Sequence, residues 1–189
     1  MIEAPPPARL VEAFANTVDV ELGTDDLDTP AHLAAWLTEH DLLPASTRVT
    51  SADHDLGLRL RGGLRESLGL HADTPDPALV AAADRALCEL PLRTTARPDA
   101  RTSLAPSPEL PPVRTGLAAV AIAWTEIGIT GDIARLKRCA EHGCAWVFWD
   151  TSKNRSRRWC SMRVCGNRTK ARRYAAKRAT APQPEATAP

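Results

Sequence analysis

Residues 139–165 read CAEHGCAWVFWDTSKNRSRRWCSMRVC, and this stretch decides how the C-terminal part of the chain can fold. It contains two Cys-x4-Cys pairs, Cys139 with Cys144 and Cys160 with Cys165, with fifteen residues between the pairs. Paired thiolates at short spacing, repeated across a loop of this size, are typical of a four-cysteine structural zinc site. We therefore expect these four sulfurs to bind one structural Zn2+ in a tetrahedron.

Two disulfides, or four unrelated thiols, are the alternative interpretation of the same cysteines. Disulfides are disfavoured in a cytoplasmic protein. The segment 131–178 is too short to bury much apolar surface, and a structural zinc ion would stabilise it by on the order of 10 kcal/mol. His142 lies inside the first pair and could serve as a ligand, but four sulfurs already fill the coordination shell. Cys88 stands alone, and no role follows for it.

The loop between the cysteine pairs is rich in aromatic and basic residues. Trp146, Phe148 and Trp159 can pack around the metal, which is the favoured interpretation in so small a module, or can stack on nucleic-acid bases. The stretches VFWD at 147–150 and RSRRW at 155–159 predict two short strands joined by a turn at Lys153-Asn154.

A basic helix is predicted directly after Cys165, where residues 166–179 read GNRTKARRYAAKRA. At about 100° per residue, Lys170, Arg173 and Lys177 share one face, while Arg168 and Arg172 lie on another. Only alanines remain to pack against the rest of the chain. Such a helix is suited to lie along phosphates or to enter a major groove.

The charge of the chain is divided between its two parts. Residues 1–130 contain ten arginines, no lysine and 19 acidic residues, a net charge of −9, whereas residues 131–178 contain 14 basic and three acidic residues, a net charge of +11. A dense positive segment indicates a polyanionic partner, most often nucleic acid. The alternative is a solvated basic tail.

The N-terminal part has the patterns of a mostly helical domain. Thr29-Pro30 and Asp76-Pro77 each combine a capping side chain with a proline suited to the first helical position. Leu10, Val11, Phe14, Thr17 and Val18 share one face of an earlier helix. Leucines recur every fourth residue from 56 to 68, a helix that Gly62-Gly63 would kink or divide.

Two further elements complete this part of the chain. Residues 92–104, LRTTARPDARTSL, predict a β-hairpin around Pro98-Asp99, and residues 115–128 predict an apolar helix. We therefore expect an α+β protein, with a predominantly helical N-terminal domain that carries a small β-hairpin. A small four-cysteine zinc module follows, made of a short hairpin and a basic helix.

The expected domain boundaries follow composition. Residues 1–8 are proline-rich and expected to be disordered, residues 9–130 form the helical domain, residues 131–178 form the zinc module, and the tail at 179–189 is expected to be disordered. The N-terminus lacks a basic region followed by an apolar stretch, and no apolar run of about 18 residues occurs anywhere. These features predict a cytoplasmic protein without a membrane span.

The zinc module resembles the bacterial CGNR zinc-finger proteins, named for the tetrapeptide that stands here as Cys165-Gly166-Asn167-Arg168. Such proteins usually carry an N-terminal ABATE domain, and FANTVDV at 14–20 and DLDTPAHLAAWLTEHDLLP at 26–44 are similar to that domain. The resemblance covers about residues 8–178 and implies a stress-response transcription regulator. One departure is Ala13, where similar proteins are expected to carry an acidic residue that could line a ligand pocket.

These observations favour a zinc-dependent DNA-binding regulator in which the N-terminal domain senses a signal or dimerises. Its expected partners are duplex DNA, a second copy of the chain and a small-molecule effector. The candidate nucleic-acid contacts are Arg155, Arg157, Arg158, Asn167, Arg168, Lys170, Arg172, Arg173 and Lys177. For Asn167, hydrogen bonding to the local backbone is the competing interpretation. The alternative functions are an RNA-binding zinc module and a thiol-based redox sensor.

An enzyme is not expected. The candidate residues in the N-terminal part are His32, His40, His54 and His71, together with scattered carboxylates. They form no metalloprotease motif, nucleophile elbow or phosphate-binding loop. Most of them are expected on solvated helix faces.

Overall fold

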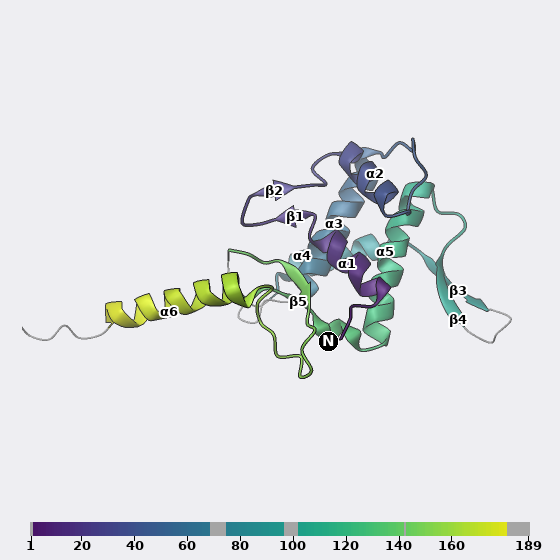
Figure 1. Ribbon diagram of the computed structural model, residues 1–189. Helices are drawn as coiled ribbons and strands as arrows, with labels where there is room; N and C mark the ends of the chain where they lie inside the picture. Colours follow the sequence, from purple (N-terminus) through teal and green to yellow (C-terminus); the bar gives the residue numbers. More distant parts are fainter. Residues whose placement is uncertain (1, 69–74, 97–101, 142, 181–189) are drawn as a thin grey trace, which may run out of the picture.

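The computed structural model describes residues 2–68, 75–96, 102–141 and 143–180 (Figure 1). Its long helices are α1 (Pro6–Ala15), α2 (Pro30–Glu39), α3 (Ser51–Ser67), α4 (Pro77–Cys88), α5 (Pro112–Ile129) and α6 (Asn167–Thr180). Two short helical turns, η1 (Asp132–Arg135) and η2 (Met162–Gly166), lie in the C-terminal part. The strands form antiparallel pairs: β1 (Val18–Asp19) with β2 (Thr24–Asp25), β3 (Leu92–Ala96) with β4 (Thr102–Pro106), and β5 (Leu136–Arg138) with β6 (Val147–Trp149). The expected α+β class, with a helical N-terminal part and a small cysteine module, is confirmed.

Both predicted helix caps are present. The Thr29 hydroxyl accepts a hydrogen bond from the His32 amide at 3.2 Å, and Asp76 Oδ1 accepts one from the Ala78 amide at 2.8 Å. In each case the following proline occupies the first turn, where no amide donor is required. These side chains set where α2 and α4 begin.

The first helix differs from its prediction at both ends. It begins at Pro6, inside the proline-rich stretch, because prolines suit the first turn of a helix. It ends at Ala15, so Thr17 and Val18 are not helical. The Thr17 hydroxyl donates to the Phe14 carbonyl at 2.8 Å, and the chain turns there into the β1–β2 hairpin, which the sequence did not predict.

The main core lies between α1, α2, α3 and α5. Its fully buried members include Phe14, Leu33, Leu37, Leu56, Leu60 and Leu117. The helix α3 runs through Gly62-Gly63 as one element, so it is not divided into two pieces there. Gly63 allows α4 to pack closely, since a Cβ at this position would lie 2.1 Å from the Cβ of Ala83.

The predicted hairpin at 92–104 is confirmed, with Leu92 opposite Pro106 and Ala96 opposite Thr102. Its expected turn at Pro98-Asp99 lies outside the described residues. The C-terminal tail from residue 181 on also lies outside them, while the backbone of α6 extends to Thr180.

The hairpin of the cysteine module uses a different strand pair from the one predicted. Its strand β6 pairs with β5, which precedes the first cysteine, and not with residues 155–159. The buried carboxylate of Asp150 explains the difference. It accepts hydrogen bonds from the backbone amides of Ser152 and Arg157, both at 2.9 Å, so the chain wraps around this side chain instead of extending along β6.

A second apolar core joins the two parts of the chain. Ala8, Val11 and Ala15 of α1, with Ala123 and Ile127 of α5, pack against Leu136, Val147 and Trp149 of the β5–β6 hairpin. The cysteine module therefore shares buried surface with the helical domain. As for membrane insertion, no helix in the described ranges has both the length and the apolar character that a bilayer crossing needs.

Candidate functional site

The four cysteines at 139, 144, 160 and 165 converge on one point. Their Sγ atoms all lie within 4.8 Å of one another, and Cys160 Sγ is 3.6 Å from the Sγ atoms of both Cys144 and Cys165. Tetrahedral zinc with Zn–S bonds of about 2.3 Å needs sulfurs about 3.8 Å apart. The donor set and its geometry therefore fit one structural zinc ion.

The surroundings of the sulfurs oppose ionisation unless a cation is present. Burial raises the pKa of the Cys144 thiol to about 12 and also raises the pKa of Cys160. A metal cation offsets this cost because thiolate, not thiol, is the ligand, so metal uptake releases protons.

The residues around the sulfurs form a small core of their own. Phe148 is buried against Cys139 and Cys165, with Trp159 packed beside them, as predicted for these two aromatics. Trp146 differs, because its side chain is 36% exposed. Ala145 holds the turn after the first pair with a φ of 50°.

A buried carboxylate in the first cysteine loop anchors the start of α6. Glu141 is fully buried, its Oε2 accepts a hydrogen bond from Thr169 at 2.7 Å, and its Oε1 lies 2.5 Å from Arg172 Nη2. Burial alone would raise the pKa of Glu141, but the Thr169 hydrogen bond and the Arg172 charge lower it overall. The Trp159 indole donates to the Thr169 hydroxyl at 3.1 Å, so both cysteine loops hold the helix.

Comparison with known families agrees with this geometry. Residues 135–178 match the CGNR zinc finger, and residues 8–128 match ABATE, described as "putative stress-induced transcription regulator". The chain belongs to the ABATE family. Among curated proteins, the comparison finds no match.

In this ABATE protein, the motif residues at 14–17 connect the two parts of the chain. The Asn16 side chain donates to the Val147 carbonyl and accepts from the Val147 amide, both at 2.8 Å, so it pairs with the edge of β6 as a strand would. Arg65 donates to the carbonyls of both Ala15 and Ala145. Asn16 was not among the residues expected to join the two parts of the chain, although it stands in the FANTVDV stretch at 14–20 that resembles the ABATE domain.

Ala13, the one departure from the expected ABATE pattern, packs partly buried against the main core. The neighbouring Glu12 is half-buried and lines the cavity between α1 and the zinc finger. A carboxylate is thus present in this region one position earlier than expected.

Arg168 of the CGNR tetrapeptide forms an ion pair with the N-terminal domain. Its two Nη atoms each lie 3.0 Å from a carboxylate oxygen of Glu21, at the tip of the β1–β2 hairpin. Both side chains remain about two-fifths exposed, at 40% and 45%. Asn167 donates its side-chain amide to the Arg163 carbonyl at 3.0 Å, which is the local backbone role.

The other candidate cations fall into two groups. Lys170, Arg173 and Lys177 are exposed on α6, and within the described part of the chain neither Lys170 nor Arg173 takes part in an ion pair. Arg157 points inward, stacks 4.9 Å from the Phe148 ring centre and donates to the Trp159 and Cys160 carbonyls. It is held by the zinc finger itself.

Arg155 and Arg158 lie in the same loop and are exposed. The carbonyl of Arg155 accepts a hydrogen bond from Lys137, which also pairs with Asp150 at 2.7 Å. The guanidinium of Arg158 lies 5.6 Å from the Trp159 ring centre. Both side chains are accessible in the loop that precedes the second cysteine pair.

The histidines of the N-terminal part are engaged separately. His32 pairs with Asp28 on the surface, while His40 and His54 bond to the carbonyls of Trp36 and Leu27. His71 and His142 lie outside the described residues. The families matched are regulator and zinc-finger types rather than enzyme families, and Cys88 is an exposed free thiol at the end of α4.

Proposed function

We propose that this protein is a transcription regulator that grips duplex DNA with the basic helix α6. The observation that carries the proposal is the placement of that helix, which extends away from the rest of the molecule (Figure 1). Its described side chains are exposed except for the half-buried Thr169 near its start, and Tyr174 is 65% exposed. A helix that packs so little gains order from a partner, and its charge favours a polyanion.

The two faces of α6 would have different roles. Arg168 and Arg172 are occupied by the carboxylates of Glu21 and Glu141. Lys170, Arg173 and Lys177 lie on the other face and would meet phosphates or base edges first. Asn167 at the start of the helix, with Arg155 and Arg158 in the loop before Cys160, would extend the contact.

Zinc would act structurally in this function. By holding the two cysteine loops together, the ion would keep Glu141 and Trp159 in place, and these residues set the direction of α6 through Thr169. The acidic N-terminal domain would position the finger through Asn16 and sense a signal or dimerise.

The test is DNA binding by zinc-loaded full-length protein, first by selection from fragmented genomic DNA and then by titration at several salt concentrations. If about six cations meet phosphates, log affinity falls with log salt at a slope near −5. Replacing Lys170 and Arg173 together by alanine should make the slope of log affinity against log salt less negative by about 2. The matched control replaces the exposed Arg48 and Arg85 of the N-terminal domain, with the same charge change and no expected effect on slope.

A slope near −1 for the wild-type protein would contradict the helix-on-phosphate proposal. An unchanged slope in the Lys170/Arg173 variant would also contradict it. Competition with structured RNA tests the RNA-binding alternative. If RNA displaces bound DNA at a lower concentration than competitor duplex DNA does, the RNA-binding alternative is favoured.

A redox-sensing function is supported by one observation. Cys144 and Cys160 are partly exposed, line a cavity and have Sγ atoms 3.6 Å apart. Peroxide would remove two electrons from these two thiolates, forming one disulfide and releasing zinc, while the peroxide is reduced to water. The function requires that peroxide abolish DNA binding and that a thiol reductant with zinc restore it. Retained DNA binding after stoichiometric zinc release would exclude this function.

A further inference from the structure

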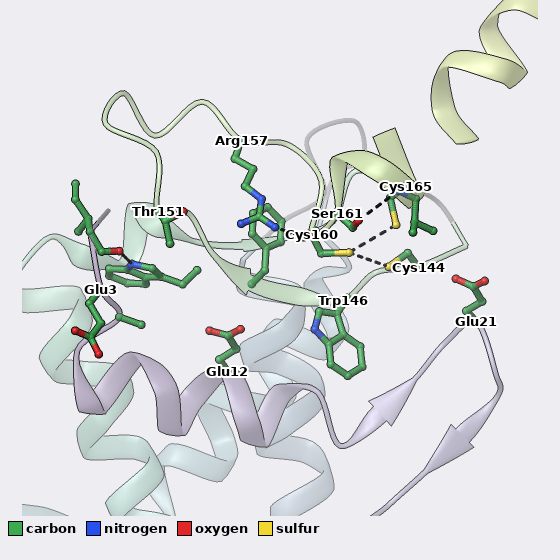
Figure 2. A pocket seen from close by; sticks show the side chains of 15 residues that line it. Glu3, Glu12, Glu21, Cys144, Trp146, Thr151, Arg157, Cys160, Ser161 and Cys165 are labelled. Carbon is green, nitrogen blue, oxygen red and sulfur yellow. Dashed lines mark hydrogen bonds between the residues drawn. The ribbon is translucent and has the colours of Figure 1, made fainter. Parts of the chain in front are cut away.

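A cavity of about 820 Å3 opens between the helical domain and the zinc finger (Figure 2). One wall comes from the N-terminal segment, α1 and the β1–β2 hairpin, and the other comes from β6 and the cysteine loops. Its size is within the range of sites for small organic ligands, which often lie at such boundaries.

The charge of the cavity is contributed mainly by one wall. Glu3, Glu12 and Glu21 line the side formed by the N-terminal domain, where Glu3 lies 3.6 Å from Arg9 and Glu21 is paired with Arg168. Among the lining residues, Arg157 is the single cation, and its guanidinium is stacked on Phe148 and bonded to two carbonyls. An anionic ligand would therefore meet carboxylates, whereas a cationic ligand would be attracted.

The opposite wall supplies aromatic faces. Trp146, Phe148 and Trp149 all line the cavity, and Trp146 keeps 36% of its surface exposed. An exposed indole face beside carboxylates favours a ligand cation, because the ring quadrupole attracts positive charge. The indole nitrogen of Trp149 already donates to the Ile2 carbonyl at 3.1 Å, which fixes that ring in the wall.

Glu12 is the best placed of the three carboxylates. It projects from α1 toward the strand β6, on the side of the cavity that faces Arg157 and Trp146 (Figure 2). Burial raises the pKa of Glu12, while a backbone hydrogen bond from Trp149 and the charge of Arg157 lower it less. A bound cation would offset the free-energy cost of removing this carboxylate from water.

A second metal ion is not the expected occupant. Within the described ranges, the four cysteines are the one group of three or more metal-ligating side chains close enough to share an ion. The carboxylates of the cavity are spread along its wall, as suits an extended molecule. Three zinc ligands, Cys144, Cys160 and Cys165, are among the residues that line the cavity.

We propose that this cavity binds an organic cation, an amine or quaternary ammonium compound with an apolar or aromatic body. Its charged group would lie between Glu12 and the face of Trp146, and its body would rest against Phe148 and Trp149. The inference concerns binding alone and does not depend on DNA recognition.

The test measures binding of defined probes to zinc-loaded full-length protein by calorimetry. The cationic probes are 2-phenylethylamine and benzyltrimethylammonium, of which the second cannot ligate zinc. The neutral and anionic controls of similar size are 2-phenylethanol and 3-phenylpropionate. We expect saturable binding of the cations, and binding of both controls weaker by about tenfold or more.

Variants locate the site. Glu12→Gln and Trp146→Leu should each weaken cation binding by about tenfold, whereas Glu39→Gln, the same charge change on the distant helix α2, should leave it unchanged. Zinc content and thermal unfolding verify that each variant is folded, and Trp146→Leu carries the test if Glu12→Gln is not. The proposal fails if 2-phenylethanol binds as well as the amine, if the cavity variants bind normally, or if neither cation saturates below about 10 mM.

Discussion

At the scale of single residues, the N-terminal domain depends on one buried arginine. Arg61 of α3 is 6% exposed and forms two hydrogen bonds of 2.6 Å with the carboxylate of Asp25, and a third of 2.9 Å with the Thr17 hydroxyl. This fork fixes the base of the β1–β2 hairpin to the core. A guanidinium buried to this degree becomes costly when its carboxylate partner is removed.

We expect Asp25→Asn to lower the free energy of unfolding by about 2–3 kcal/mol at pH 7. The Arg61 hydrogen bond lowers the pKa of Asp25 in the folded protein, so its contribution is complete above the unfolded value near 3.8 and disappears as pH falls through the folded pKa. Urea unfolding at pH 7 and near pH 3 measures this, and the difference between variant and wild type should shrink at the lower pH.

The control for this prediction is Asp28→Asn, since Asp28 pairs with His32 on the surface. Its effect should stay within about 0.5 kcal/mol. An Asp25 variant as stable as the wild type at pH 7 would contradict the role of this pair.

A second residue-scale contact couples the domain to the candidate DNA helix. Glu21 pairs with Arg168, so in the proposed complex it would compete with a DNA phosphate for the same guanidinium. Removing the carboxylate should free that cation for nucleic acid.

Glu21→Gln should therefore strengthen DNA binding about threefold at moderate salt. It should also make the slope of log affinity against log salt more negative by about 0.9. Glu39→Gln makes the same change in net charge far from α6 and serves as the control. Equal effects of the two variants would mean that net charge, and not the Arg168 pair, restrains binding.

At the scale of elements, the pairing of α3 with α4 depends on one glycine. A Cβ at Gly63 would lie 2.1 Å from the Ala83 Cβ and 2.6 Å from the Leu79 carbonyl oxygen. At Gly62, one position earlier, nothing lies within 4 Å of such an atom. The two neighbouring glycines therefore have opposite roles.

Gly63→Ala should destabilise the protein by about 2–3 kcal/mol, because the two helices must separate to accommodate the methyl group. Gly62→Ala should stabilise it by about 0.5–1 kcal/mol through helix propensity. Thermal and urea unfolding measure both, and a Gly63 variant as stable as the Gly62 variant would refute the close packing.

At the scale of the whole molecule, the zinc finger and the helical domain share buried contacts. They share the apolar core around Val11, Val147 and Trp149, and Asn16 bonds to the edge of β6. Disorder of the finger would expose the α1 face of this core to water.

Chelation of zinc should therefore increase amide hydrogen exchange in α1, although α1 lies far from the cysteines in the chain. The helix α2 packs into the main core instead, and its amides should remain protected. Hydrogen exchange followed by mass spectrometry, with and without a chelator, measures the two segments in the same sample.

The Asn16→Ala variant tests the same coupling in the presence of zinc. This variant leaves the amide and carbonyl of Val147 without their side-chain partner. Its free energy of unfolding, measured in urea, should therefore be lower than that of the wild type by about 1–3 kcal/mol. Unchanged exchange in α1 after complete zinc removal would show that the finger and the domain are independent.

The sequence by itself determined the features that depend on local chemistry. Cysteine spacing identified the metal ligands, since two short loops bring sulfurs together whatever surrounds them. Capping residues placed the starts of α2 and α4, because a cap bonds to amides only a few positions away. The basic character of α6 likewise follows from the order of its residues.

Only the tertiary structure decided which distant groups meet. Three contacts illustrate this: β6 pairs with β5, Arg168 pairs with Glu21, and Glu141 anchors α6. No repeating pattern in the sequence indicates that these residues meet. Buried groups such as the Glu141 carboxylate and the Val147 amide take whichever partner the packing brings near, because leaving them unpaired costs more than any local preference. The cavity between the domain and the finger has the same origin, since each part of the chain supplies only one of its walls.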